Sequence, residues 1–542
     1  MISDTVSELR QRQASPAQDL PRSQIALIFF ALLAAVTLPL LIFKIPVMAD
    51  YPNHLARIYA IASLSHDPLL ARYYEIDWRL VPDLAVDAIM PLLAQAVGIF
   101  TAGKLFVVLT IALLATGPVA LYHALYRRID LWPFTAFLFV YNTDFFFGLL
   151  NYLFATAVAL WATAVWIRLR ERPPLLRAFI SLLFILALFF CHFLGIGIYG
   201  MAIGCCELRR WYDTPGRQRT LLRDAAVLLL PFLLVLPLTL ASPTVGFAQD
   251  TLWRLWPDKA LGLYFIFKSY SRSLAIAFAL VTSGVVLWGF WTKRLHLHPA
   301  GMLFAALAAF VYLAMPFKLM SASLVDARLP ATFLLFLIGM SRWEQRSATE
   351  ARRFAAVLLA LAALLITEIA GYWAHYQSAI ARMEQSFIHI APGSRVLVAV
   401  NEHGADPTDS SILLHLPALV MIERSALYSH AFTHPAKQPL QLKSPYRASA
   451  PYDGMPLFVG DLAAADGKPT SAPPVDADNS DRQRFYWTRW RRDYDYLYVL
   501  FTPPAYVAPL DGLEPLDAGG VFALYRIDHN ESATAGRGGS QD

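Results

Sequence analysis

Long apolar runs separated by short polar segments dominate the chain up to about residue 375. A helix of about 20 apolar residues is long enough to cross a bilayer. Runs of near-membrane length lie at residues 24–45, 103–125, 131–148, 150–167, 177–191, 193–208, 224–242, 273–291, 299–317, 329–341 and 354–374. The pattern predicts an all-α polytopic membrane domain over residues 24–375, with about eleven transmembrane helices.

A polar segment that contains Asp50 and Pro52 follows the first apolar run. Because Pro52 disfavours the α conformation of the residue before it, the first span should end there. Apolar residues at helical spacing from Leu55 onward predict a surface helix after this proline. Residues 81–100 are apolar but carry two aspartates and two prolines, so we expect them at the outer surface. The outer loop then covers residues 46–102.

Arginine and lysine residues gather in alternate loops between the predicted spans. Cytoplasmic loops of membrane proteins are enriched in these residues. The rule predicts an inner (plasma) membrane protein with a cytoplasmic tail at residues 1–23 and a periplasmic location for everything after residue 375. The loops predicted to be cytoplasmic carry Arg127, Arg128, Arg168, Arg170, Arg172, Arg177, Arg209, Arg210, Arg217, Arg219, Arg223, Lys293, Arg294, Arg342, Arg346, Arg352 and Arg353.

From about residue 376 the composition changes to that of a folded extracytoplasmic domain. Residues 395–400, 496–501 and 520–527 alternate with turn-rich loops and are typical of strands. We therefore expect a small C-terminal periplasmic α/β domain over residues 376–530. Residues 531–542 lack apolar content and are predicted to form a disordered tail.

Composition agrees with a membrane protein and excludes several other classes. The chain is 57% hydrophobic and 16% charged, against roughly 45–50% and about 25% in soluble domains. The net charge of +5 gives no indication of nucleic-acid binding. Cys191, Cys205 and Cys206 lie in or beside apolar runs, so neither a disulfide framework nor a zinc site is predicted. The sequence carries no P-loop, GxGxxG, GxSxG or HExxH motif.

Ionisable side chains collect at the predicted outer ends of the spans. Arginine and lysine are suited to binding a phosphate. Glu368 lies within the last span, where ionisable residues are rarely without a role. Each of these side chains has an ordinary alternative, as a solvated loop residue or as a cation that reaches the lipid headgroups. The candidates are Asp50, His54, Arg57, Asp144, His192, Lys268, Arg272, Lys318, Arg328 and Glu368.

The order of these segments resembles the GT-C superfamily of membrane glycosyltransferases, which includes protein mannosyltransferases and aminoarabinose transferases. The family combines an anchor span, an acidic residue in the first outer loop, surface helices, many further spans and a C-terminal outer domain. The motif Ala49-Asp50-Tyr51-Pro52-Asn53-His54 matches that first outer loop, and residues 82–98 resemble its later surface helices. Residues 325–330, which include Arg328, resemble the late outer loop that meets the lipid phosphate.

The resemblance implies that Asp50 is the catalytic base and that the sugar donor is linked to polyprenyl phosphate. A carboxylate can indeed deprotonate an acceptor hydroxyl, and the leaving phosphate needs cations more than a second carboxylate. No second acidic residue accompanies Asp50 in an Asp-Asp, Asp-Glu or Asp-Xxx-Asp pair. No metal ligand is therefore predicted, and a divalent metal stays open as a cofactor.

We therefore expect an inverting glycosyltransferase of the cell envelope that acts at the periplasmic face. Its partners would be membrane lipids, the polyprenyl-phosphate donor, and a lipid, glycan or protein acceptor. One alternative is a transporter or flippase of a lipid-linked or envelope substrate, and another is a non-catalytic membrane component. Transporters place ionisable groups near the membrane midplane, whereas here they gather at one face, which favours surface chemistry.

Overall fold

A computed structural model describes residues 20–214, 220–247, 251–254, 256–320, 322–401, 413–450, 457–466, 486–503 and 506–529. The predicted C-terminal tail and all but the end of the predicted N-terminal tail lie outside these residues. Within them, seven helices are long and apolar enough to cross a membrane. These helices are α2 (Arg22–Ile42), α6 (Ile99–Tyr126), α8 (Leu150–Arg168), α9 (Pro174–Cys191), α11 (Leu221–Leu240), α13 (Arg272–Trp291) and α16 (Ala348–Ser386).

The other expected spans are shorter or more polar helices. Helix α10 (Phe193–Asp213) ends in a charged turn, while α14 (Pro299–Ala314) and α15 (Leu329–Gly339) have 16 and 11 residues. The run at 131–148 does not form one helix. It divides into the 3-10 helix η1 (Trp132–Phe139) and the short helix α7 (Thr143–Phe147).

The break in this run is caused by a side chain. Asn142 lies between the two helices, and its side chain accepts hydrogen bonds from the backbone N–H groups of Asp144 and Phe145. This N-cap starts a new helix in place of a continued one. Gly148 ends α7 in a left-handed conformation with φ +81°. The result is a non-spanning turn between η1 and α8.

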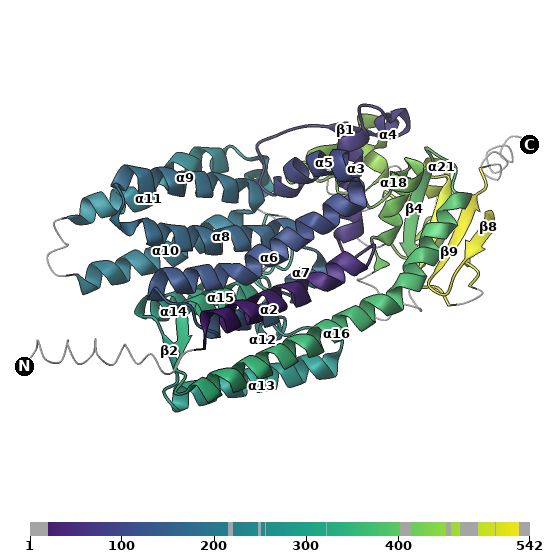
Figure 1. The fold of residues 1–542 in the computed structure, drawn as a ribbon. Coiled ribbons are helices and arrows are strands. Elements are labelled where there is room, and N and C mark those ends of the chain that lie inside the picture. The colour runs from purple at the N-terminus through teal and green to yellow at the C-terminus, as the bar shows by residue number, and fades with distance from the viewer. Residues whose placement is uncertain are drawn as a thin grey trace, which may run out of the picture.

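Three short helices cover the end of the bundle that faces the C-terminal part (Figure 1). They are α3 (Tyr51–Ser63), α4 (Pro68–Tyr73) and α5 (Ala85–Val97). Helix α3 begins one residue before Pro52, not after it, and α2 ends at Ile42, earlier than the predicted end of the first span. Helix α5 has 13 residues, fewer than a bilayer crossing requires. The remaining short elements of the membrane part are η2 (Leu169–Glu171), η4 (Pro243–Phe247), α12 (Asp258–Tyr264) and the strand pair β2 (Leu295–Leu297) with β3 (Ser341–Trp343).

The C-terminal part is a five-stranded sheet with short helices, so the expected small α/β domain is confirmed as the fold class. The strand order is β5-β4-β7-β9-β8. Strand β4 is parallel to both of its neighbours, β5 and β7, whereas β9 is antiparallel to both of its neighbours. The strands are β4 (Arg395–Val400), β5 (Leu427–Tyr428), β7 (Tyr496–Leu500), β8 (Leu513–Ala518) and β9 (Phe522–Ile527). The helices are η5 (Phe387–His389), η6 (Leu416–Leu419), α18 (Val420–Arg424), η7 (Ser444–Ser449), α19 (Val459–Asp466) and α21 (Trp490–Asp493).

The two parts are joined by more than the chain connection. Helix α16 continues through residue 375 and carries the chain from the bundle to the sheet (Figure 1). Strand β1 (Tyr74–Ile76) of the outer loop pairs with β6 (Leu440–Leu442) of the C-terminal part. Helix α3 packs against η6 and α18. Residues of the outer loop are therefore enclosed between the bundle and the sheet.

Candidate active site

Asp50 lies where α2 gives way to α3, at the interface of the bundle and the C-terminal part. It precedes the first residue of α3, but its side chain forms no capping hydrogen bond. Its backbone N–H donates to the Phe147 carbonyl at 3.0 Å, and that of Ala49 donates to the Phe146 carbonyl at 2.9 Å. A Cβ atom on Gly148 would lie only 3.1 Å from the Asp50 nitrogen. The turn after α7 thus fixes the backbone of Asp50 and leaves its carboxylate free.

The surroundings of Asp50 suit a general base. Burial raises the pKa of its carboxyl to about 7, against the opposing effect of the positive charges of Arg328 and Arg57. The side chain is still 27% exposed, so a substrate can reach it. A carboxylate with a pKa near the working pH is well matched to proton abstraction.

Arg328 is the cation that links the predicted site residues. Its Nη1 lies 3.2 Å from His192 Nε2, and its Nη2 donates to the Ser323 carbonyl at 2.8 Å. The hydroxyl of Tyr152 donates to the Arg328 carbonyl at 3.0 Å. The charge of Arg328 acts on both Asp50 and Asp144. The structure therefore brings together residues from four separate parts of the membrane domain.

Asp144 is buried and His192 is half-buried, and both lie near Arg328. Burial raises the pKa of Asp144 to about 8, so at neutral pH this carboxyl is largely protonated and can donate a hydrogen bond. Burial lowers the pKa of His192 to about 4, so its ring is neutral. Neither residue adds a negative charge beside Arg328, which leaves the guanidinium available for an anion.

His54 and Arg57 lie on α3 but have different neighbours. The His54 ring packs edge-on against Phe432, with 5.4 Å between the ring centres. Arg57 is buried and donates to both carboxylate oxygens of Asp87, at 2.7 and 3.0 Å. This bidentate pair joins α3 to α5 and partly satisfies the charge of Arg57.

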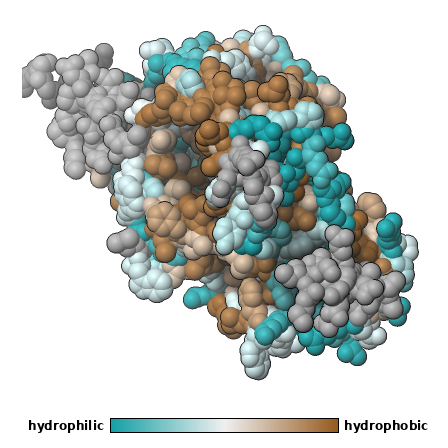
Figure 2. Space-filling model, turned by 90° about the vertical axis from the view of Figure 1, so that its left-hand side faces the viewer, coloured by the Kyte–Doolittle hydropathy of each residue, from teal (hydrophilic) through white to brown (hydrophobic). Residues whose placement is uncertain are grey.

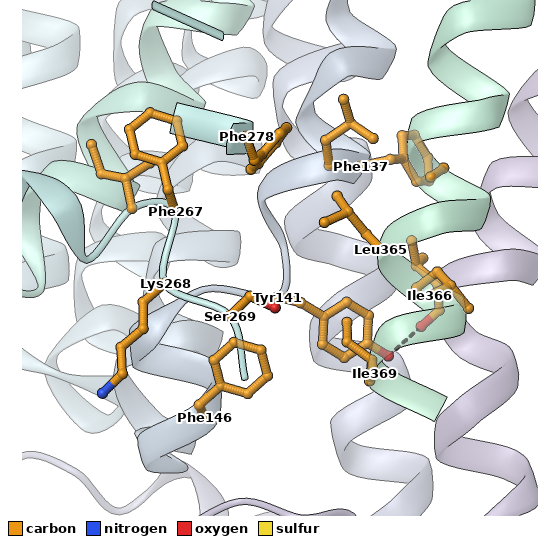
Figure 3. Close-up of a pocket in the computed structure, with 14 residues that line it drawn as sticks. Phe137, Tyr141, Phe146, Phe267, Lys268, Ser269, Phe278, Leu365, Ile366 and Ile369 are labelled. Atoms are coloured by element: carbon orange, nitrogen blue, oxygen red, sulfur yellow. Dashed lines mark hydrogen bonds between the residues drawn. The ribbon is translucent and has the colours of Figure 1, made fainter. Parts of the chain in front are cut away.

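A small apolar pocket with a cavity volume of about 20 Å³ lies beside Phe146 of α7 (Figure 3). It is lined by aromatic and aliphatic side chains of α2, η1, α13 and α16, and by residues 266–269. Phe146, whose carbonyl binds Ala49, forms part of its wall. Lys268 is at one edge, and its ammonium group lies 5.3 Å from the centre of the Phe147 ring. No carboxylate of the described residues is paired with this lysine.

Three predicted residues lie apart from the Asp50 group. Arg272 is exposed at the start of α13, and Lys318 pairs through its backbone with Leu252. Glu368 accepts hydrogen bonds from the Ser269 hydroxyl and the Ser271 backbone N–H, at 2.5 and 2.7 Å. Glu368 therefore anchors the segment that carries Lys268 to α16.

His415 and Asn53 were not among the predicted site residues. Nε2 of His415 lies 3.7 Å from Asp50 Oδ1, and Nδ2 of Asn53 lies 3.3 Å from His415 Nδ1. His415 interrupts an apolar run at residues 412–422, which is a signal for a polar function inside a core. Nothing in the sequence indicates that this run packs on α3.

The described residues contain no group of three or more His, Cys, Asp or Glu side chains that could hold a metal ion. The positive charge of Arg328 acts on the carboxyl groups of Asp50 and Asp144, and Asp83 Oδ1 lies 3.8 Å from Nε2 of His192. A cation already occupies the position next to these carboxyl groups, so the donor set does not fit a divalent metal.

No model of a known protein family matches the sequence, and no curated protein matches it. Among solved structures, the chain is similar to ArnT from Cupriavidus metallidurans in the apo state. The TM-score is 0.47 and the identity 12%, over 94% of this chain and 98% of that chain. At this TM-score the similarity is an observation only, and we base the function on the residues of this chain.

Proposed function

We propose that the protein is an inverting membrane glycosyltransferase that moves a sugar from a polyprenyl-phosphate donor to an acceptor hydroxyl at the periplasmic face. The observation that carries this proposal is the partly exposed Asp50, whose pKa is raised to about 7 beside the guanidinium of Arg328. A base and an anion-binding group at one membrane exit are what transfer from a lipid phosphate requires.

The reaction is a single displacement. The acceptor oxygen attacks the anomeric carbon while Asp50 takes the hydroxyl proton. The bond between that carbon and the phosphate oxygen breaks, and polyprenyl phosphate leaves with the bonding electrons. The phosphate is stable as an anion, so it needs no proton donor. Asp50 then loses its proton to water.

Two cations are suited to the phosphate. Arg328 offers a planar fork for bidentate binding, and its neighbours His192 and Asp144 are uncharged at neutral pH. Lys268 is half-buried over the Phe147 ring and has no anionic partner among the described residues. The apolar side chains beside Lys268 would contact the hydrocarbon chain of a donor whose phosphate binds this lysine.

The test is sugar transfer by the purified protein in lipid nanodiscs, with a panel of polyprenyl-phosphate sugars. Release of polyprenyl phosphate is the readout. Asp50→Asn should lower the rate by about 10²–10⁴-fold, the usual share of a general base. Arg328→Ala should also raise the donor KM, because the phosphate loses a charge-assisted partner.

Asp77→Asn is the matched control, because Asp77 is a carboxylate of the same outer loop that is 40% exposed and paired with Arg79. Its rate should equal that of the parent. Transfer at the parental rate by Asp50→Asn would end the catalytic claim. If the parent transfers no sugar but moves a lipid-linked substrate across liposomes, the protein is a transporter.

A further inference from the structure

His415 belongs to the C-terminal part, yet its side chain lies at the centre of the candidate site. It immediately precedes η6 and is buried against α3. Its ring also packs edge-on against Phe432, with 5.2 Å between ring centres. Because its Nε2 lies 3.7 Å from Asp50 Oδ1, the C-terminal part contributes a side chain directly opposite the proposed base.

The amide of Asn53 determines which nitrogen of His415 carries the proton. Asn53 Oδ1 accepts a hydrogen bond from the Phe432 backbone N–H at 3.1 Å. Asn53 Nδ2 donates to the His430 carbonyl at 2.7 Å and lies 3.3 Å from His415 Nδ1. These two backbone partners fix the orientation of the amide. Because the amide nitrogen can only donate, His415 Nδ1 must be the acceptor.

Tyr428 favours the same tautomer. Its hydroxyl lies 3.5 Å from His415 Nδ1 and is a second potential donor to that atom. A neutral imidazole with an accepting Nδ1 carries its one proton on Nε2. Burial lowers the pKa of His415 to about 3, so the ring is neutral at physiological pH. The Nε2 proton therefore points toward Asp50.

We propose that His415 is a positioning residue for Asp50, and that its Nε2–H group orients the carboxylate for proton abstraction. The inference rests on the proposed function, in which Asp50 is the base. The distance of 3.7 Å is longer than a hydrogen bond. Catalytic contacts of this kind commonly tighten when the substrate binds. His415 keeps its proton throughout, and Asp50 alone exchanges one.

Two substitutions separate this role from a packing role. The amide nitrogen of Gln in His415→Gln can occupy the position of Nε2 and donate to Asp50. The amide oxygen in His415→Asn can occupy the position of Nδ1 and satisfy Asn53, but the shorter side chain does not reach Asp50. If His415 only packs against α3, His415→Asn should be the better tolerated variant.

The experiment compares kcat, donor KM and pH profile of the parent and both variants in nanodiscs. We expect kcat of His415→Asn to fall by roughly 10–100-fold, the size found when groups that orient metal ligands are removed. Donor KM should stay unchanged. Because a hydrogen bond to the charged form lowers a carboxyl pKa, the acid limb of kcat/KM should move to higher pH in His415→Asn and stay in place in His415→Gln.

The two variants leave the other ionisable groups around Asp50 unchanged. A shift of the acid limb therefore reports on His415. These other groups are Arg57, Arg328, Asp144, His54 and Tyr428. Equal rates and equal pH profiles for the two variants would overturn the inference while leaving Asp50 as the base. An inactive parent, or a fully active Asp50→Asn, would instead overturn the proposed function.

Both His415 variants could fail to fold. A further variant then tests the inference, because it leaves His415 in place but no longer fixes which ring nitrogen carries the proton. Asn53→Ala combined with Tyr428→Phe removes both donors to His415 Nδ1, while the imidazole stays in place. The acid limb should again move to higher pH. An unshifted limb in Asn53→Ala/Tyr428→Phe would overturn the inference.

Discussion

Asp50 and Asp144 lie in the field of the same guanidinium but differ in how far water can reach them. The Asp50 side chain is 27% exposed, whereas the whole Asp144 residue is 3% exposed. Burial raises the pKa of both carboxyls, to about 7 and about 8. Near neutral pH Asp50 is therefore ionised in a large fraction of molecules and open to a substrate, while Asp144 is mainly a neutral donor. Two similar carboxyls thus differ in their ionisation and accessibility because their environments differ.

The raised pKa of Asp50 predicts a pH-dependent effect on stability. The folded state binds this proton more tightly than the unfolded state, whose carboxyl has the ordinary pKa of 3.8. The stabilising contribution is fully present below about pH 3.8 and is lost as the pH rises through about 7. Asp50→Asn has no carboxyl that ionises, so it does not lose this stability as the pH rises. Its melting temperature should therefore exceed that of the parent at pH 8, and the difference should be smaller at pH 5.

Thermal unfolding of the purified proteins in one detergent at pH 5 and pH 8 measures this difference. Asp144 titrates in both proteins, so its contribution cancels in the comparison. Asp77→Asn should follow the parent at both pH values. A constant offset between Asp50→Asn and the parent would show that Asp50 has no raised pKa.

The sequence indicates single candidate residues but not their partners. Asp50 and Arg328 stand at the ends of apolar runs, where polar residues are exposed to the membrane surface, and such positions are readable from hydropathy. The pairing of Arg57 with Asp87 depends on how α3 packs against α5. His415 reaches Asp50 only through contacts between distant segments. Pairings of this kind are set by tertiary packing, which periodicity does not encode.

At the scale of elements, the turn from α7 to α8 shows why apolar length alone is insufficient. Residues 131–148 are apolar enough to suggest a span, but the Asn142 cap and Gly148 convert the segment into a turn. A hydropathy average does not register a single side-chain cap. The resulting turn delivers the Phe146 and Phe147 carbonyls to the backbone of the Asp50 loop.

Gly148→Ala should impair both stability and transfer. A residue with a Cβ in the left-handed region costs roughly 1–2 kcal/mol. The added Cβ would also lie 3.1 Å from the backbone nitrogens of Asp50 and Tyr51, a contact that neither atom can relieve by rotation. We expect a lower melting temperature and a lower kcat, measured in the same nanodisc assay.

Gly197→Ala is the control for this substitution. Gly197 lies within α10, and an added Cβ there meets no atom within 4 Å. Alanine favours a helix over glycine by roughly 0.8–1 kcal/mol, so Gly197→Ala should be at least as stable as the parent and equally active. If Gly148→Ala matched Gly197→Ala in both measurements, the turn would have no part in holding Asp50.

At the scale of the whole molecule, the chain has two chemically different ends. The C-terminal sheet and α3 lie at one end of the bundle, and Arg127, Arg168 and Arg210 lie at helix ends on the other (Figure 1). Figure 2 faces this other end, where hydrophilic side chains lie beside the apolar flanks of the helices. The division of charge was readable from the sequence. The pairing of β1 with β6 was not, because a three-residue strand carries too little pattern to reveal its partner.

The charge difference between the ends predicts the orientation in the membrane. The arginine-rich end should be cytoplasmic, which places Asp50 and the sheet on the outside. Ser65 lies between α3 and α4 and Glu171 lies in η2; both are exposed, and they belong to opposite ends. The native cysteines are buried, so Ser65→Cys and Glu171→Cys can be labelled selectively. A membrane-impermeant maleimide added to intact cells should label Ser65→Cys, and Glu171→Cys only after permeabilisation. Labelling of Glu171→Cys but not Ser65→Cys in intact cells would invert the topology and move the Asp50 site to the cytoplasmic face, where a periplasmic transferase could not work.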